Sequence, residues 1–420
     1  MCESRARLIV HSLEASRLGD GLGDGLGDGL GDGLGSGVLR MLSQRAVVLS
    51  RPGDLVVVDS MPDGDWLDFL GSIGFEVGSI CVAGGKGETL VERILSDASL
   101  MAELGRGSWV VEPYMGGEEV ERLAGLLGDG LGGGLRGPRA SLLDRVNLKS
   151  NLCPILGHAG VATIPTTVAS KRDVMVTARH MLNEYGAVMV RSDLSIGGLG
   201  VWKVEGGDDL DRLGEGVSVA VDERLFVLQP LLEVMGSPNV QYEIGEEGAE
   251  LLGVSGQEMT QSFAFGGNSY PSVFGDDLRL LEQGERVGRW LFEAGYRGIV
   301  GIDFIVTNDE GGGGEVFIVE INPRVNTSTF PLMMGKRLGK GAFRLMTGIR
   351  VEGVEGFGDV AGGVGEGLMF DVSKGYGMVP LMVPTAGRGV LDAMVFGDDL
   401  AEVDGVCKTL LARLKDGVRA

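Results

Sequence analysis

Positive charge is scarce in this chain of 420 residues, which has 37 Lys and Arg side chains against 59 Asp and Glu. The resulting formal net charge of -22 opposes binding to nucleic acid or to an anionic membrane surface, because both attract basic faces. A phosphate-bearing ligand of so acidic a protein would need a few placed cations, glycine-rich backbone donors and a metal ion. Those are the features to look for in the sequence.

Cysteine, histidine and long apolar runs are also rare. The 4 cysteines are scattered without a CxxC pair, which argues against a disulfide framework or a zinc site. The 3 histidines leave few candidates for a catalytic triad or a histidine metal site. No apolar run has the length of a membrane span, and the first residues lack the pattern of a signal peptide. We therefore expect a cytoplasmic protein with no membrane partner.

Glycine is abundant, and much of it lies in two low-complexity stretches. The unit GDGL repeats within residues 19–37 and cannot bury a core face, which predicts a disordered segment. Its glycines fall only on odd positions, whereas the second and third glycines of the GxGxxG dinucleotide fingerprint must be three residues apart. The fingerprint is therefore absent from the repeat. A second stretch at 128–137 has the composition of a linker. We predict a first domain over 1–140, a second over 141–350 and a third over 351–420.

Apolar periodicity predicts α/β and α+β structure. In the first domain, four short runs separated by helical patterns indicate a Rossmann-like, largely parallel sheet: 46–50, 54–60, 75–83 and 108–115, with helical spacing over 91–101. The second domain has an α+β pattern, with helices near 171–185 and 277–294 and strands at 187–192, 201–204, 224–232, 240–244, 251–259, 298–306 and 315–323. The third has strands around 367–396 and a closing helix, an α+β pattern again.

The last two strands of the second domain carry acids inside apolar runs and are joined by the turn-rich TNDEGGGG, which predicts a hairpin. Glu320 and Asn322 are two residues apart, so both side chains leave the same face of a strand. A register centred near residue 311 would bring Asp303 beside them. Two carboxylates and an amide oxygen at one spot suit Mg²⁺ bridging nucleotide phosphates. The alternative is a rim of polar strand ends in solvent.

A glycine-rich turn, SIGGLGV over residues 195–201, links two predicted strands. Its backbone N–H groups can close over phosphates without side-chain obstruction, although this signal is weak in so glycine-rich a chain. The residues concerned are Ser195, Gly197, Gly198 and Gly200. Arg191 on the preceding strand and Lys149 in RVNLKSNL are candidate phosphate-binding cations, or else solvated surface charges.

The segment VLQPLLE, residues 227–233, is an apolar strand that opens into a polar and proline-containing turn. Its backbone groups can pair with an adenine edge between apolar walls, and Glu233 can accept from ribose hydroxyls. The adenosine candidates are Gln229, Pro230, Leu231, Leu232 and Glu233. A core strand that leaves its sheet would have the same composition.

Taken in order, these motifs resemble those of the ATP-grasp superfamily over about residues 141–345. The preceding domain looks like a pre-ATP-grasp domain, and the tail looks like a small C-terminal domain found in a biosynthetic subgroup. Within that subgroup the chain is similar to the pheganomycin-type peptide ligases. This similarity implies that a nonproteinogenic, guanidino-bearing amino acid is joined to the amino end of a peptide, in natural-product biosynthesis. It also implies a homodimer.

The resemblance implies a role for each motif. Lys149 and Arg191 would contact the α and β phosphates of ATP, SIGGLGV would be the lid, and the segment from Gln229 to Glu233 would hold adenosine. The metal ligands would be Asp303, Glu320 and Asn322. Arg324, in the NPR sequence, would neutralise the transferring phosphoryl group and the tetrahedral intermediate, unless it forms only a strand-end salt bridge. Arg191 departs from the family pattern, which usually has Lys, so the phosphate geometry there is open.

The implied activity is an ATP-dependent, Mg²⁺-requiring ligation of a carboxylate to an amine of a peptide or amino acid. The carboxylate would become an acyl phosphate that the amine then attacks, with release of ADP and phosphate. Two alternatives remain. The chain is an ATP-binding module that has lost catalysis, or it forms carboxyphosphate for a biotin-type carboxylation, for which no carrier segment is visible.

Overall fold

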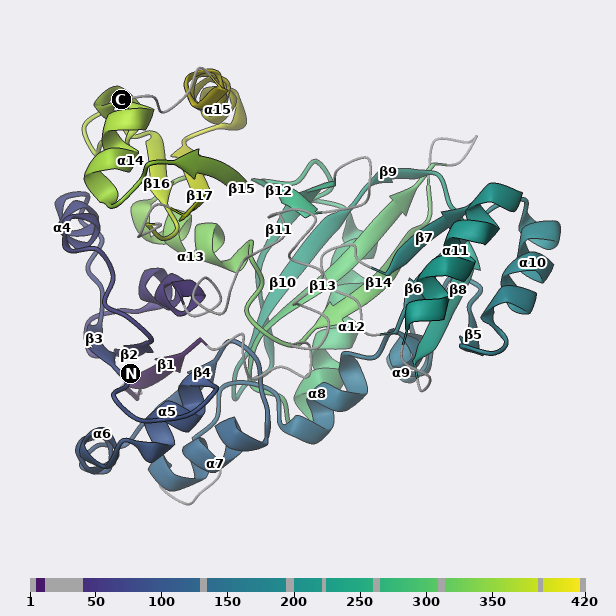
Figure 1. Ribbon diagram of the computed structural model, residues 1–420, viewed down its shortest axis with the longest axis horizontal. Coiled ribbons are helices and arrows are strands. Elements are labelled where there is room, and N and C mark those ends of the chain that lie inside the picture. Colours follow the sequence, from purple (N-terminus) through teal and green to yellow (C-terminus); the bar gives the residue numbers. More distant parts are fainter. Residues whose placement is uncertain are drawn as a thin grey trace.

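The structure is a computed structural model, and it describes residues 5–11, 41–128, 134–193, 200–220, 224–259, 265–308, 314–383 and 388–415. The predicted disordered repeat at 19–37 lies outside these residues. Three sheets are spread along an elongated molecule, with a small parallel sheet at one end, a large central sheet and a small antiparallel sheet at the other end (Figure 1).

The first sheet is parallel throughout, as predicted. Its strand order is β3-β2-β1-β4, with β1 (Arg7–Val10), β2 (Leu55–Val58), β3 (Ser79–Val82) and β4 (Val110–Pro113). Helices packed around it are α4 (Gly64–Ser72), α5 (Leu90–Ser96), α6 (Ala98–Leu104) and α7 (Glu118–Leu127). Strands that are buried on both faces need continuous apolar runs, which the Val-rich sequences supply.

Two predictions for this domain were wrong. Residues 46–50 were predicted as a strand, but 46–49 belong to a 3-10 helix, η1 (Leu42–Leu49), and β2 pairs with β1 and β3 instead. The helical pattern at 91–101 is not one helix, because Asp97 interrupts it. The Asp97 side chain accepts from the backbone N–H groups of Ser99 and Leu100 and thereby starts α6.

A second, antiparallel sheet has the order β5-β8-β6-β7 and forms the right-hand end of the molecule in Figure 1. Its strands are β5 (Thr167–Ser170), β6 (Val188–Ser192), β7 (Val201–Val204) and β8 (Leu225–Pro230). The helices α10 (Val174–Tyr185) and α11 (Gly207–Val219) cover one face. Their apolar residues recur at helical spacing and form a separate core with the strands.

The central sheet is antiparallel, in the order β14-β13-β10-β11-β12-β15-β17-β16, and β9 (Val234–Gly236) also pairs with β13. The strands are β10 (Pro238–Ile244), β11 (Ala249–Met259), β12 (Phe265–Tyr270), β13 (Gly298–Thr307), β14 (Val316–Asn322), β15 (Ala342–Glu352), β16 (Gly377–Pro380) and β17 (Arg388–Gly397). The predicted boundary between residues 350 and 351 falls inside β15, and β16 and β17 continue the same sheet. The division into three domains stays a prediction.

Helices complete the packing at the junctions. α12 (Leu278–Glu293) lies on the central sheet through a stripe of buried apolar residues, and α15 (Leu400–Lys415) packs on β15 and β17. The shorter ones are α8 (Ala140–Val146), η2 (Lys149–Asn151), α9 (Leu152–His158), α13 (Thr329–Leu338), α14 (Phe357–Val364) and η3 (Glu366–Leu368). The first and last parts of the chain share one core, in which fully buried Trp66 donates from Nε1 to the Pro380 carbonyl at 3.1 Å. Within the described ranges, no helix combines the length and apolarity that crossing a membrane requires.

Candidate active site

The carboxylate pair lies where the predicted hairpin register places it. Asp303 on β13 is directly opposite Glu320 on β14, and Gly301 is opposite Asn322. The register shifts next to Asp303, and such a bulge is common where a strand redirects a side chain. The structure therefore brings Asp303, Glu320 and Asn322 together on adjoining strands. That they bind a metal stays a prediction.

Amide side chains from three strands hold Asp303. Its Oδ1 accepts from Asn239 Nδ2 at 2.6 Å and from Gln257 Nε2 at 2.5 Å, and its Oδ2 accepts from Asn322 Nδ2 at 2.9 Å. Asn239 in turn accepts from Ser328 Oγ at 3.3 Å, and Ser328 is itself buried. These bonds fix the orientation of the carboxylate before any ligand is present.

The two carboxylates have opposite pKa shifts. Burial, followed by the charge of Glu320, raises the pKa of Asp303 to about 6. Burial alone would also raise the pKa of Glu320, but Lys149, Arg324 and Arg191 together hold it below the usual value. The site is thus a repelling pair of acids on which three cations converge.

Arg324 connects this pair to the first sheet. Its Nη2 donates to Asn322 Oδ1 at 2.9 Å, and its Nη1 donates to the hydroxyl of Tyr114 at 3.3 Å. The guanidinium also lies over the Tyr114 ring, 5.5 Å from its centroid, a cation–π arrangement. Tyr114 follows β4, so a residue of the first domain helps to orient the predicted catalytic arginine.

Lys149 is the first residue of η2, near the start of the predicted second domain, and its side chain extends into the site. Its Nζ lies 3.2 Å from Glu320 Oε1, and the lysine side chain is 7% exposed. The next residue, Ser150, donates to Asp193 through both its backbone N–H, at 2.8 Å, and its hydroxyl, at 2.9 Å. Asp193, just after β6, therefore anchors the segment that carries the lysine.

Arg191 on β6 bridges the small antiparallel sheet and the central sheet. It donates from Nη2 to Gln229 Oε1 at 2.7 Å and from Nη1 to the Val319 carbonyl at 3.3 Å. Gln229 is fixed by a further bond from its Nε2 to Thr166 Oγ1 at 2.8 Å. Burial lowers the pKa of Arg191, and Glu320 only partly offsets this effect. The planar guanidinium group of Arg191 thus donates from its two terminal nitrogens to two acceptors on different sheets, which the single ammonium group of a lysine would not reproduce.

The predicted adenosine segment leaves β8 beside this arginine. Pro230 ends β8, and the Leu231 N–H donates to the Ala187 carbonyl at 3.0 Å, so that donor already has a partner within the sheet. Leu232 follows it and is half-buried, while Glu233 is exposed. Glu233 Oε1 accepts from Asn308 Nδ2 at 3.1 Å.

The predicted phosphate loop lies mostly outside the described residues, and this applies to Ser195, Gly197 and Gly198. Gly200, at its end, has a φ of 64°, a left-handed conformation that favours glycine. Its carbonyl accepts from the Ser192 N–H at 2.7 Å, which brings the two ends of the loop together.

Two family models match the chain. Residues 43–128 match the pre ATP-grasp domain, and residues 162–328 match the ATP-grasp domain. These two matches together span more than half of the chain, and the second contains the Arg191, Gln229, Asp303 and Glu320 positions. The chain belongs to the ATP-grasp superfamily. No curated protein matches it.

Solved structures share the ATP-grasp fold along the whole length of the chain. N5-carboxyaminoimidazole ribonucleotide synthetase from Thermus thermophilus has 15% identity and a TM-score of 0.57, and the match covers 98% of this chain and 99% of that one. Biotin carboxylase from Campylobacter jejuni has 16% identity and a TM-score of 0.60, with 97% and 91% covered. The biotin carboxylase domain of Hydrogenobacter thermophilus 2-oxoglutarate carboxylase has 14% identity and a TM-score of 0.60, with 98% and 90% covered. Identities this low establish the fold alone.

The donor set of this ATP-grasp site fits a magnesium ion. Asp303 and Glu320 repel one another across the hairpin, and an oxygen-ligating cation would relieve that repulsion. No cluster of three or more His, Cys, Asp or Glu side chains suited to a metal occurs in the described ranges. Asn322 Oδ1 accepts one hydrogen bond, from Arg324, so one of its two lone pairs would be left for a cation.

Sequence reasoning missed the residues that position this ATP-grasp site. These are Tyr114, Thr166, Asp193, Asn239 and Gln257. For Asn239 and Gln257 the sequence contains only a weak signal, because their strands, PNVQYEI and AELLGVSGQEM, hold several other polar residues. The run NTST at 326–329 also supports the site from behind, because its buried Ser328 and Thr329 hydrogen-bond to β10.

Proposed function

We propose that this chain is an ATP-dependent, Mg²⁺-requiring ligase that joins a carboxylate to an amine, forming an amide through an acyl phosphate. The observation that supports this most strongly is the convergence of three cations on the Asp303–Glu320 pair. Lys149 contacts Glu320 directly, and Arg324 contacts Asn322 beside it. In a chain with a formal charge of -22, such a cluster favours a polyphosphate ligand at this place.

ATP in this proposal takes the positions that the ATP-grasp resemblance assigns. Lys149 and Arg191 bind its α and β phosphates, the loop 195–201 closes over them, and the segment 229–233 binds adenosine. Gln229 acts through Arg191, to which it is hydrogen-bonded. When bound, Mg²⁺ neutralises charge on the phosphate oxygens, and the residues that would hold it are Asp303, Glu320 and Asn322.

The chemistry requires positioned charges and no side-chain nucleophile. A carboxylate oxygen of the acid substrate attacks the γ-phosphorus as the bond to ADP breaks. The amine nitrogen then attacks the acyl carbon, phosphate leaves, and the amine proton passes to solvent. Arg324, oriented by Tyr114, neutralises charge on the phosphoryl group and on the tetrahedral intermediate.

For the substrates, we propose a nonproteinogenic, guanidino-bearing amino acid and a peptide amine, as in the pheganomycin-type biosynthetic peptide ligases. The sequence resemblance supports this, and the acidic surface would attract cationic substrates. The scattered cysteines favour the cytoplasm, and Cys81, Cys153 and Cys407 are free in the structure. A homodimer remains part of the proposal.

The experiment is release of ADP and phosphate from Mg²⁺-ATP across a panel of carboxylates, bicarbonate included, with and without amino-acid and peptide amines. Glu320→Gln tests the site, and Glu285→Gln is its matched control, because Glu285 is an exposed residue of α12 that forms an ion pair with Arg289, four residues along the same helix. We expect release that needs both an acid and an amine, falls by at least tenfold in Glu320→Gln and is unchanged in Glu285→Gln.

Other outcomes would separate the alternatives. ATP binding without turnover on any pair would identify a module that has lost catalysis. Release that depends on bicarbonate alone would indicate carboxyphosphate chemistry. Equal activity in Glu320→Gln and in the unmodified chain would contradict the assigned site.

A further inference from the structure

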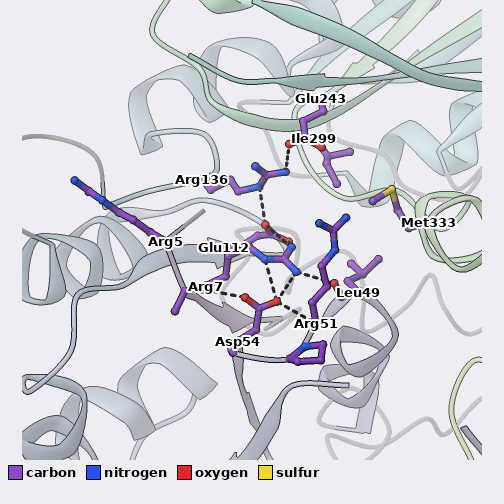
Figure 2. Close-up of a pocket in the computed structure, with 13 residues that line it drawn as sticks. Arg5, Arg7, Leu49, Arg51, Asp54, Glu112, Arg136, Glu243, Ile299 and Met333 are labelled. Atoms are coloured by element: carbon purple, nitrogen blue, oxygen red, sulfur yellow. Dashed lines mark hydrogen bonds and ion pairs between the residues drawn. The ribbon is translucent and has the colours of Figure 1, made fainter. Parts of the chain in front are cut away.

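A polar pocket lies at the amino ends of β1 and β2, and Figure 2 shows the residues that line it. Tyr114, which follows β4, contacts Arg324 at the carboxyl edge of the same sheet. The volume of the pocket is about 300 Å³, which is the size of a small-molecule site. The first sheet, the turn before β2, β10, β13 and α13 all contribute to its walls. The lining residues are Arg5, Ala6, Arg7, Leu49, Arg51, Pro52, Gly53, Asp54, Glu112, Arg136, Glu243, Ile299 and Met333.

Two of the four arginines form ion pairs with the three acids of the pocket. Arg7 donates to Asp54 and to both oxygens of Glu112, the latter two each at 3.2 Å. Arg136 lies 2.7 Å from Glu112 and 2.7 Å from Glu243. Figure 2 shows this network as a continuous chain across the pocket. The carboxylates are therefore already paired, and none is left to neutralise a further cation.

Arg51 is the cation that remains on the turn before β2. Its backbone N–H donates to Asp54 at 2.9 Å, but its guanidinium has no hydrogen-bond or ion-pair partner among the described residues. In Figure 2 it extends from the Arg51–Asp54 turn toward Arg136 and Ile299. Gly53 in this turn has a φ of 95°, so the backbone that presents Arg51 depends on glycine there.

A neighbouring arginine indicates that positive charge is in excess here. Arg337 donates from Nη1 to the Ser50 carbonyl at 2.7 Å and stacks on Phe75, 3.7 Å from the ring centroid. Its pKa is lowered, first by burial and then by repulsion from Arg51 and Arg7, and nearby acids offset this only in part. Crowded guanidinium groups are unusual in a chain with 59 acids and 37 basic residues.

We propose that this pocket binds a small anion carrying a phosphate or carboxylate group, with the Arg51 guanidinium as its principal donor. A guanidinium fork matches both groups, since each presents two oxygens in a plane. Such a ligand would contact the first sheet, the Arg136 segment and the central sheet at once. It would therefore bind across the junction of two domains, away from the ATP-grasp site.

The test is calorimetric titration of the full-length chain with inorganic phosphate and, separately, with malonate, at constant ionic strength. Constant ionic strength removes non-specific screening effects. Arg51→Gln removes the guanidinium group and its positive charge. Arg51→Lys keeps the positive charge but removes the planar guanidinium geometry. Arg212→Gln is the matched control, because Arg212 is also an exposed arginine, 72% exposed on α11. Phosphate binding at the proposed ATP site would be unaffected by all three variants.

We expect saturable binding of at least one probe, weakened tenfold or more by Arg51→Gln, weakened less by Arg51→Lys and changed less than twofold by Arg212→Gln. The probe that binds distinguishes a phosphate site from a carboxylate site. Binding by Arg51→Gln within twofold of the unmodified chain would overturn the proposal, and so would the absence of saturable binding with both probes. Urea unfolding of each variant verifies that the substitution leaves the fold intact.

Discussion

The buried histidine of the first domain provides a pH-dependent test of the fold. His11 follows β1, is 3% exposed and packs edge-on against Tyr114 and Phe330, with ring centroids 5.6 and 6.0 Å away. Neither ring nitrogen has a hydrogen-bond partner among the described residues. Burial lowers the pKa of His11 to about 4, and Glu112 opposes this without cancelling it. We expect His11→Phe to remove a pH-dependent loss of stability.

The magnitude follows from the difference between the two pKa values. The unfolded chain has the ordinary value of 6.5, so it binds a proton on falling pH before the folded chain does. Neutral His11 therefore stabilises the fold above about pH 6.5, and this stability is lost as the pH falls toward about 4. The full difference corresponds to about 3 kcal/mol, of which about 2 kcal/mol is already lost at about pH 5.

The assay is urea unfolding near pH 7.5 and near pH 5 for the unmodified chain, His11→Phe and His180→Phe. His180 is the control because its side chain is 80% exposed. Any packing cost of the larger ring is independent of pH and cancels when the two pH values are compared. Between the two pH values, we expect the free energy of unfolding of His11→Phe to fall by about 2 kcal/mol less than that of the unmodified chain. The decrease in His180→Phe should equal that of the unmodified chain. Equal losses in all three would refute the assigned burial of a neutral histidine.

Three further substitutions test other parts of the structure. Glu112→Gln should lower the free energy of unfolding by about 3–5 kcal/mol in urea titrations, because it removes a buried carboxylate that two partly buried arginines share. Gly301→Ala should cost about 1–3 kcal/mol by the same measurement, because the added Cβ would lie 2.4 Å from the Asn326 amide. Tyr114→Phe should reduce kcat/KM of the proposed ligase by about 3- to 10-fold, the value of one hydrogen bond to Arg324, with the ring contact kept.

Each of these has a matched control in the chain. Glu285→Gln breaks an exposed pair and should change stability by less than about 0.5 kcal/mol. Gly125→Ala on α7, where a Cβ meets nothing within 4 Å, should be neutral or stabilising by up to about 1 kcal/mol. Tyr185→Phe alters a tyrosine 43% exposed on α10 and should leave kcat/KM unchanged. A prediction fails wherever the test variant and its control behave alike.

Local pattern was sufficient for the hairpin that carries the acids. Asp303 and Glu320 interrupt apolar runs on either side of a glycine-rich turn, and these two facts define both the strands and their register. The same reasoning failed for residues 46–50, because an apolar run of that length suits a strand or a buried helical turn equally well. Only the pairing of β1 with β2 decides between them, and that contact is not local in sequence.

The hydrogen-bond partners of the predicted site residues could not be predicted from the sequence, because these contacts are also not local in sequence. Tyr114 and Arg324 are 210 residues apart, and Asn239 and Asp303 are 64 apart. A sequence pattern indicates that a polar residue is buried, but it does not indicate which donor satisfies it. The continuation of the central sheet by β16 and β17 is another such long-range pairing.

The three cations that lower the pKa of Glu320 come from three different structural units. Lys149 belongs to the segment that enters the second domain, Arg191 to the small antiparallel sheet, and Arg324 to the loop after β14, where Tyr114 of the first domain contacts it. Because each unit supplies one cation, the charge of the site depends on the units being correctly assembled. In the proposed function, displacing any one unit would weaken phosphate binding without altering a single predicted ligand. Tyr114 and Asp193, neither of them a predicted ligand, therefore belong to the proposed site.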